Sequence, residues 1–129
     1  MAKLIPTVIT SLLRNQSANC SSGNKCRDFS HVSDIGNCLA LLVESDHEGA
    51  VNLASGHGCS ISEITTLLAE LLERPDLLRL GGIQDQSHEP LFMLPDISTL
   101  KSAINYEFPP LKRRLEEVIE GWRVNLSTK

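Results

Sequence analysis

The chain is poor in aromatic residues and has no excess of positive charge, and these shortages argue against several classes of protein. Aromatic residues make up 4% of its 129 residues, which leaves few rings to stack on nucleic-acid bases. The formal net charge is −4, so no broad basic surface exists to attract nucleic acid or an anionic membrane. No apolar run approaches the roughly 20 residues that span a bilayer. We therefore expect neither a nucleic-acid partner nor a membrane partner.

The cysteines and the first residues lack the patterns of a zinc-binding or secreted protein. The four cysteines form no CxxC pair and fit no common zinc spacing: Cys20, Cys26, Cys38 and Cys59. The stretch MAKLIPTVITSLL carries one lysine and an apolar run that Pro6 interrupts, and no signal-peptide cleavage site follows it. We expect four free thiols, no metal site and a cytoplasmic location.

The remaining composition is that of an ordinary globular protein. Hydrophobic residues make up 41% of the chain and charged residues 22%. A chain of this length fits one domain, which we place at residues 1–129. Helix and strand patterns alternate along it, which predicts an α/β fold with about five helices and a small mixed sheet of short strands.

The helices are predicted from apolar periodicity and from capping residues. Residues 5–13 repeat apolar side chains at i, i+3, i+4 and i+7. Ser33 is a candidate N-cap for a second helix, whose apolar stripe contains Ile35, Cys38, Leu39, Leu42 and Val43. Later, Asp96 is the candidate cap of a short helix, and residues 111–122 form a final amphipathic helix.

The clearest start signal belongs to the helix in the middle of the chain. Ser60 and Glu63 form a capping box, in which each side chain satisfies a backbone amide at the helix start. Pro75 is expected to stop this helix. Three short apolar runs are predicted strands, at residues 26–32, 50–55 and 76–80. The polar stretch at residues 15–25 is a predicted loop.

Several small constellations have chemical and structural readings. His31 and Asp34 are three residues apart, but no third or fourth metal ligand has a suitable spacing, so a helix cap is the better interpretation. The loop ASGHGCS follows a predicted strand but lacks both GxGxxG and the lysine of a Walker loop. Cys59 beside His57 suggests a thiol nucleophile, yet adjacent residues seldom place both groups productively, and a structural cysteine is favoured.

Arg27 leaves two readings open. It is either a structural charge, solvated or in a salt bridge to Asp28, or a guanidinium that binds a diphosphate with two parallel hydrogen bonds. Composition and spacing do not choose between the two.

Six segments arrive in an order that resembles a known family: KLIPTVI, RDFSHVSDI, AVNLASGHGCSISEI, LLERPDLLRL, EPLFMLPDISTL and LEEVIEGW. They resemble the carboxyl-terminal part of extended short-chain dehydrogenases/reductases, and most closely the NAD-dependent nucleotide-sugar epimerases and 4,6-dehydratases. The resemblance runs from Lys3 to Trp122.

The resemblance implies one lobe of a two-lobed enzyme. In such enzymes a Rossmann lobe holds NAD and a smaller lobe holds the nucleotide-sugar. This chain resembles the smaller lobe plus one returning strand, and it lacks the family's glycine-rich NAD fingerprint. It also lacks the catalytic YxxxK pair, because Tyr106 is the only tyrosine and Pro110 follows it four residues later. The resemblance therefore implies no catalytic residue here and no cofactor bound by this chain alone.

The same resemblance implies a set of substrate-binding residues. Arg27 matches the arginine that pairs with the diphosphate of the substrate. Lys3 and Leu4 match the segment that lies near the nucleotide base, and Ser60 stands where a polar residue can reach the nucleotide. Gln86 stands at about the position of another arginine of the family.

The function that we expect is that of a detached substrate-binding lobe that binds a nucleoside-diphosphate sugar without catalysis. The alternatives are an interaction or regulatory module that kept the fold and lost the ligand, and, least favoured, an independent enzyme. A missing lobe would expose apolar faces, so we expect a homodimer or a separate Rossmann-lobe partner. The expected dimer interface contains Val51, Leu53 and the apolar side of residues 5–13.

Overall fold

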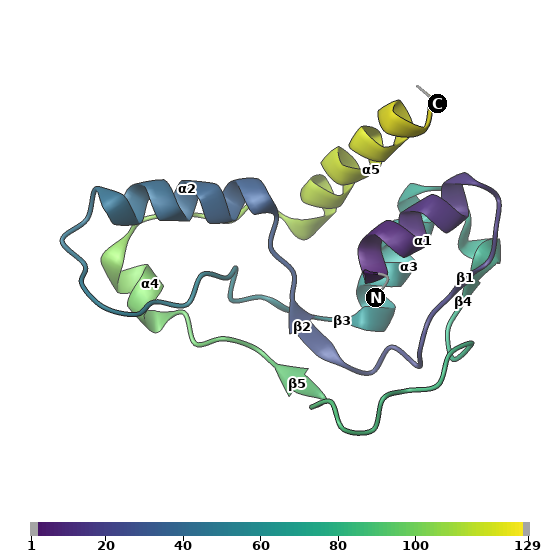
Figure 1. The fold of residues 1–129 in the computed structure, drawn as a ribbon, viewed down its shortest axis with the longest axis horizontal. Coiled ribbons are helices and arrows are strands. Elements are labelled where there is room, and N and C mark those ends of the chain that lie inside the picture. Colours follow the sequence, from purple (N-terminus) through teal and green to yellow (C-terminus); the bar gives the residue numbers. More distant parts are fainter. Residues whose placement is uncertain (1–2, 128–129) are drawn as a thin grey trace.

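The structure describes residues 3–127. In this range three α-helices pack together at one end of the molecule, two more lie at the other end, and a small sheet lies between them (Figure 1). The structure is a computed structural model, and it has the predicted α/β class. Within residues 3–127 no helix has the length and apolar character that crossing a membrane requires. The helices are α1 (Leu4–Leu13), α2 (Val32–Val43), α3 (Ile61–Leu71), α4 (Ser98–Ala103) and α5 (Leu111–Ser127).

The main hydrophobic core lies between α1, α3 and α5. The apolar stripe predicted for residues 5–13 faces inward, and Val8, Ile9 and Leu12 are at most 2% exposed. From α3 and α5 the buried partners are Ile64, Leu68, Ala69, Leu72, Leu115 and Ile119. Burial of this apolar surface is the main force that holds the three helices together. These side chains are thus covered within a single chain, and the dimer interface expected to include them stays a prediction.

Helices α1 and α3 end in the same way. Asn15 and Glu73 adopt left-handed backbone conformations, with φ of 55° and 57°, just beyond the two helices. The following amides, of Gln16 and Arg74, bond back to carbonyls in the last helical turn, at 2.9 and 2.8 Å. Helix α3 therefore ends at this turn, before the stop predicted at Pro75. Pro75 itself begins a short 3₁₀ helix, Pro75–Leu77.

The sheet is small and mixed, as predicted. Strand β2 (Cys26–Asp28) lies between β3 (Gly58–Ser60), which runs antiparallel to it, and β5 (Phe92–Met93), which runs parallel. A separate parallel pair joins β1 (Ala18–Asn19) to β4 (Leu78–Arg79) beside the three-helix core. Residues 15–25, expected to be loop throughout, thus contain β1. The strands predicted at 26–32 and 76–80 are shorter than expected.

The strand predicted at residues 50–55 is absent. Within residues 3–127 no other strand lies alongside this segment, and a strand forms only where its backbone groups find a neighbour to pair with. The end of the segment is held instead by Asp28, whose carboxylate accepts hydrogen bonds from the amides of Ser55 and Gly56, at 3.1 and 2.7 Å. Gly56 has a φ of 78°, and a Cβ there would lie 2.2 Å from Ile97. This tight turn therefore requires glycine.

The start of α2 also differs from the expectation. His31, and not Ser33, is the N-cap: its Nδ1 accepts a hydrogen bond from the amide of Ser33 at 3.2 Å. At α4 the N-cap residue is Ile97 and not the expected Asp96, although the Asp96 carboxylate still accepts from the amide of Ser98 at 2.8 Å. His31 is the N-cap because it is the last residue with an extended backbone before the helix, and its imidazole nitrogen can accept a hydrogen bond from a free amide of the first turn.

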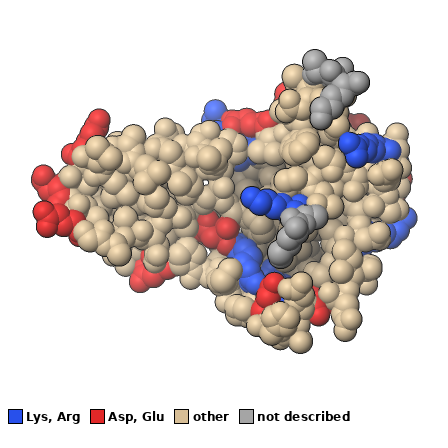
Figure 2. Space-filling model, in the orientation of Figure 1, with Lys and Arg blue, Asp and Glu red and all other residues tan. Residues whose placement is uncertain are grey.

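Several apolar side chains are exposed on α2 and near β5. On α2, Cys38 is buried as expected, but Leu39 and Val43 of the same predicted stripe are 50% and 86% exposed. Near β5 the exposed apolar residues are Leu91, Phe92, Met93 and Leu94. Figure 2 shows acidic side chains at the end of the molecule beyond α2, and basic and acidic side chains close together near the middle of the same face. These two groups of exposed apolar side chains, on α2 and near β5, lie outside the three-helix core.

Candidate functional site

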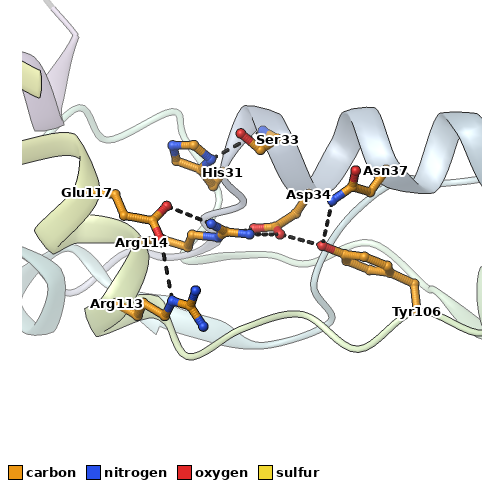
Figure 3. Close-up of polar contacts among 8 residues, drawn as sticks. All are labelled: His31, Ser33, Asp34, Asn37, Tyr106, Arg113, Arg114 and Glu117. Atoms are coloured by element: carbon orange, nitrogen blue, oxygen red, sulfur yellow. Dashed lines mark hydrogen bonds and ion pairs between the residues drawn. The ribbon is translucent and has the colours of Figure 1, made fainter.

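A buried carboxylate joins α2 to α5. Asp34, in the first turn of α2, has a side chain that is 2% exposed, and it accepts two hydrogen bonds from Arg114 of α5, at 2.9 and 2.5 Å. The hydroxyl of Tyr106 donates a third, at 2.6 Å, and accepts one from Asn37 at 3.2 Å. Figure 3 shows these side chains converging from α2, α5 and the segment before α5.

The electrostatics of this cluster favour a permanently charged pair. Burial raises the pKa of Asp34, but the hydrogen bonds from Arg114 and Tyr106 and the positive charge of Arg114 outweigh it, so the pKa lies below its ordinary value. The hydrogen bonds to Asp34 and then to Glu117 raise the pKa of Arg114 further. The Glu117 carboxylate accepts from Arg114 at 2.6 Å. All groups of the cluster are thus engaged with one another.

For Asp34 the sequence favours a helix cap over a metal ligand, and it predicts no role for Arg114. A signal was nevertheless present: Arg114 lies three residues after Leu111 and one before Leu115, within the apolar stripe of α5. A cation in an apolar stripe indicates a buried partner. In the structure Asp34 and Arg114 hold the start of α2 against α5. The amide of Asp34 donates to the carbonyl of His31 at 3.0 Å, and the Asp34 carboxylate is engaged by Arg114 and Tyr106 instead of sharing a ligand with His31.

A cavity of about 640 Å³ lies beside this cluster and is lined by loop residues around Ser55–Cys59 and Tyr106–Leu111. Asp34, Tyr106 and Arg114 line it as well. Their polar atoms are already satisfied by one another, so they offer little to a ligand.

A second cavity, also of about 640 Å³, lies between α1 and the long segment between β4 and β5, and we call it the Lys25 cavity. Its volume is in the range of ligand-binding pockets. Its apolar lining includes Leu4, Val8, Cys20, Ile61 and Ile83. Its polar lining includes Lys3, Asn19, Ser21, Lys25, Gln86 and Glu89. The cavity therefore offers both an apolar surface and charged or polar groups to a ligand.

One carboxylate holds two cations at this cavity. Lys25 Nζ donates to Oε2 of Glu89 at 2.9 Å, and Arg27 Nη2 lies 3.5 Å from the same oxygen. The side chains of Lys25 and Arg27 are 9% and 16% exposed, whereas that of Glu89 is 39% exposed. The hydrogen bond and charge of Lys25, then the charge of Arg27, lower the pKa of Glu89, so the carboxylate stays ionised at neutral pH.

The guanidinium of Arg27 is fixed further by backbone carbonyls. Its Nη1 donates to the oxygens of Cys26 and Leu91, at 2.8 and 3.3 Å. The alternative partner considered from the sequence, Asp28, is instead bound by Ser30 and by the Ser55–Gly56 turn. Arg27 is therefore neither solvated nor paired with Asp28.

Three of the five predicted substrate-binding residues line one cavity. Lys3, Leu4 and Gln86 come from distant parts of the sequence and meet at the Lys25 cavity. Arg27 is outside the lining and connects to it through Glu89. Ser60 is also outside the lining, since its hydroxyl caps α3 by accepting from the amide of Glu63 at 3.1 Å.

Lys25 is the residue that the sequence analysis missed. It stands two residues before Arg27, and in extended chain such residues face the same side. The Lys25 carbonyl accepts a hydrogen bond from the amide of Ile61, and its ammonium donates to the carbonyl of Gln86. Two cations at i and i+2 leading into a strand were the available signal for an anion site.

The loop before α3 does not fit a dinucleotide. On a dinucleotide-binding helix the pyrophosphate lies at the N-terminus. In this chain the Glu63 carboxylate occupies that position, accepting from the amide of Ser60 at 2.7 Å. Burial, followed by the nearby charge of Glu63, raises the pKa of Cys59, which opposes the nucleophile reading. Among residues 3–127, no group of three or more His, Cys, Asp and Glu residues could hold a metal ion.

Comparisons with known proteins give a consistent picture. No family model matches the chain. The chain is 28% identical over 103 residues to dTDP-4-dehydro-6-deoxy-D-allose reductase of a Streptomyces species, which covers 80% of this chain and 31% of the reductase. Its fold superposes on UDP-N-acetylglucosamine 4-epimerase from Methanobrevibacter ruminantium M1 with a TM-score of 0.86 and 25% identity, over 96% of this chain and 40% of the epimerase.

A third protein extends the likeness to a dehydratase. The chain superposes on dTDP-glucose 4,6-dehydratase from Bacillus anthracis, solved in complex with NAD, with a TM-score of 0.80 and 18% identity, over 95% of this chain and 40% of the dehydratase. The chain spans about a third of the length of the curated relatives it matches. These homologues and structural neighbours are extended short-chain dehydrogenases/reductases that act as nucleotide-sugar epimerases, dehydratases and related enzymes, and this chain matches a part of that family.

Proposed function

We propose that this chain is a nucleotide-sugar-binding lobe that binds a nucleoside-diphosphate sugar in the Lys25 cavity and does not catalyse on its own. The observation that carries the proposal is the meeting of Lys3, Leu4 and Gln86 at one cavity beside Lys25. The likeness to nucleotide-sugar enzymes over almost the whole chain supports the ligand class.

The cavity offers each part of such a ligand a suitable environment. The apolar side chains of Leu4, Val8 and Ile61 would cover the faces of the base, while Gln86 would offer an amide to its polar edge. The diphosphate would lie against Lys25 and Arg27, because a guanidinium and an ammonium form charge-assisted hydrogen bonds with phosphate oxygens. The sugar would project beyond Arg27.

Redox chemistry requires groups outside this set of residues. The hydroxyl of Tyr106 is bound to Asp34 and Asn37, and Pro110 stands where the YxxxK pair of the family has its lysine. NAD would be held by a Rossmann lobe, a part of the related enzymes that this chain does not match. We therefore infer that catalysis needs a partner lobe or does not occur.

The exposed apolar surface supports a partner. Leu39 and Val43 of α2, and Phe92 and Met93 of β5, are half or more exposed, and such side chains gather where another protein surface packs. A separate Rossmann lobe or a second copy of this chain would cover them. The four cysteines, which are free in the structure, support a cytoplasmic location because a reducing compartment keeps thiols unpaired.

A second candidate function is an interaction module without a ligand. The observation that favours it is Glu89, which already neutralises the two cations that a diphosphate would use. In that case the exposed apolar surface carries the function and the cavity is a remnant.

Calorimetric titration tests the proposal. UDP, dTDP and UDP-glucose are titrated into the wild-type chain and into Arg27→Ala and Arg113→Ala variants. We expect weak binding that Arg27→Ala reduces by about 1.5–3 kcal/mol, the value of a hydrogen bond to a charged group. Arg113 is 68% exposed on α5, so its removal should leave the affinity unchanged. No binding of any nucleoside diphosphate at millimolar concentration would favour the interaction module.

A further inference from the structure

Glu89 stands between the two cations that the proposed ligand would need. Its Oε2 is 2.9 Å from Lys25 and 3.5 Å from Arg27, so a single oxygen faces both positive groups. A phosphate oxygen of a bound diphosphate would occupy the same position, since phosphate and carboxylate oxygens use the same hydrogen-bond donors. The two anions therefore exclude each other.

The three side chains differ in how easily they can move. Lys25 and Arg27 are nearly covered, and the Lys25 ammonium is also fixed by the carbonyl of Gln86 at 2.9 Å. Glu89 belongs to the exposed segment before β5, and its side chain is more than a third exposed. Leaving a buried cation without an anion is costly, so the pair keeps either Glu89 or a ligand oxygen. Glu89 is the member that can turn into solvent.

We propose that Glu89 is an internal competitor of the ligand: its carboxylate occupies the Lys25–Arg27 anion site until a more highly charged phosphate group displaces it. The displaced carboxylate moves into water, where its charge is solvated. This proposal depends on the proposed function for the identity of the ligand, but displacement by an anion is testable without any nucleotide.

The competitor also affects which ligands bind. Any anion must displace the Glu89 carboxylate, so its affinity is reduced by the cost of that displacement, and a doubly charged diphosphate overcomes this cost more readily than a singly charged group because it gains more from the two cations. A neutral nucleoside makes no use of the two cations and meets no competition from Glu89.

Inorganic pyrophosphate is the probe of choice. It is titrated calorimetrically into the wild-type chain and into Glu89→Gln and Glu70→Gln variants, each shown to be folded by thermal unfolding. Glu70→Gln removes the same charge from an exposed position on α3 and controls for the change in net charge. We expect pyrophosphate to bind Glu89→Gln at least tenfold more tightly than the other two chains. Equal affinity for all three would overturn the proposal.

A measurement on the wild-type chain avoids reliance on one variant. With ¹³C-labelled glutamate, saturating pyrophosphate should shift the Glu89 carboxyl resonance toward that of a solvated side chain. Binding that leaves the resonance in place would overturn the proposal. The Glu89→Asp variant, whose side chain is one methylene shorter, should bind pyrophosphate with an affinity between those of wild type and Glu89→Gln.

The same titrations with UDP separate this proposal from the proposed function. A gain for pyrophosphate in Glu89→Gln without any UDP binding keeps the competitor and rejects the nucleotide-sugar site. UDP binding of equal strength in both chains keeps the nucleotide site and rejects the competitor.

Discussion

Arg114 of α5 and Asp34 of α2 are 80 residues apart in sequence and form a two-point ion pair, with donor–acceptor distances of 2.9 and 2.5 Å. The pair lies where α5 approaches the start of α2 (Figures 1 and 3). It therefore connects the three-helix core to the part of the chain that carries the exposed apolar surface.

Removal of one partner should be strongly destabilising. Asp34→Ala leaves Arg114 without its main anion and Tyr106 without an acceptor, so we expect the free energy of unfolding to fall by about 3–5 kcal/mol. Chemical denaturation gives this value. Asp46→Ala, at an exposed position after α2, is the matched control and should be close to neutral. Equal midpoints for the two variants would contradict the role of the ion pair.

The stability of the chain should depend on pH in a defined direction. The pKa of Asp34 is lower in the folded chain than in the unfolded one, so the folded state binds this proton less readily. Its contribution is complete above the unfolded value, about 4, and is lost as the pH falls through the folded pKa. Urea denaturation between pH 2 and 7 should show a steeper acid loss for wild type than for Asp34→Asn. Parallel curves would argue against ionised Asp34 as the source.

Ser60 can be assigned by a pair of measurements. Its hydroxyl caps α3, and we expect Ser60→Ala to lower the free energy of unfolding by about 1 kcal/mol, the typical value of an N-cap. Because Ser60 does not line the Lys25 cavity, nucleotide affinity should stay unchanged. Ser87→Ala, in the exposed segment before β5, serves as control. A loss of affinity with unchanged stability would restore the nucleotide role.

Self-association should depend on the exposed residues near β5. If two copies cover this surface, light scattering should give a dimeric mass at high micromolar concentration, and Phe92→Glu should return the chain to a monomer. Phe92 is 71% exposed, so the substitution should disturb little packing within the chain. A monomeric mass for wild type would reject the homodimer and leave a separate lobe as the partner.

Local signals predicted most of the helices, and long-range contacts explain most of the errors. The Ser60–Glu63 capping box marked the start of α3, because both of its partners lie within four residues. The strand expected at residues 50–55 did not form, since a strand depends on a neighbour that an apolar run cannot reveal. The apolar stripe on α2 has the same sequence pattern whether or not another surface packs on it, so the sequence could not predict the exposure of Val43.

The candidate site was predicted in part for the same reason. The resemblance indicated Lys3, Leu4 and Gln86, which the fold brings to one cavity. The ion pair between Arg27 and Glu89 joins residues that are 62 positions apart in the sequence. It forms because the segment before β5 folds back beside β2, which no local sequence pattern predicts.

The Asp34–Arg114 pair also bears on how the chain unfolds. The helices α1, α3 and α5 share a buried core, whereas α2 and α4 lie outside it. Amide hydrogens of α2 should therefore exchange with solvent through partial openings that leave the core intact, at a lower free energy than those of α3. The ion pair holds α2 to α5, so it raises the free energy of the α2 opening and narrows the difference between the two openings. Its loss should make the amide hydrogens of α2 exchange faster while those of α3 change little.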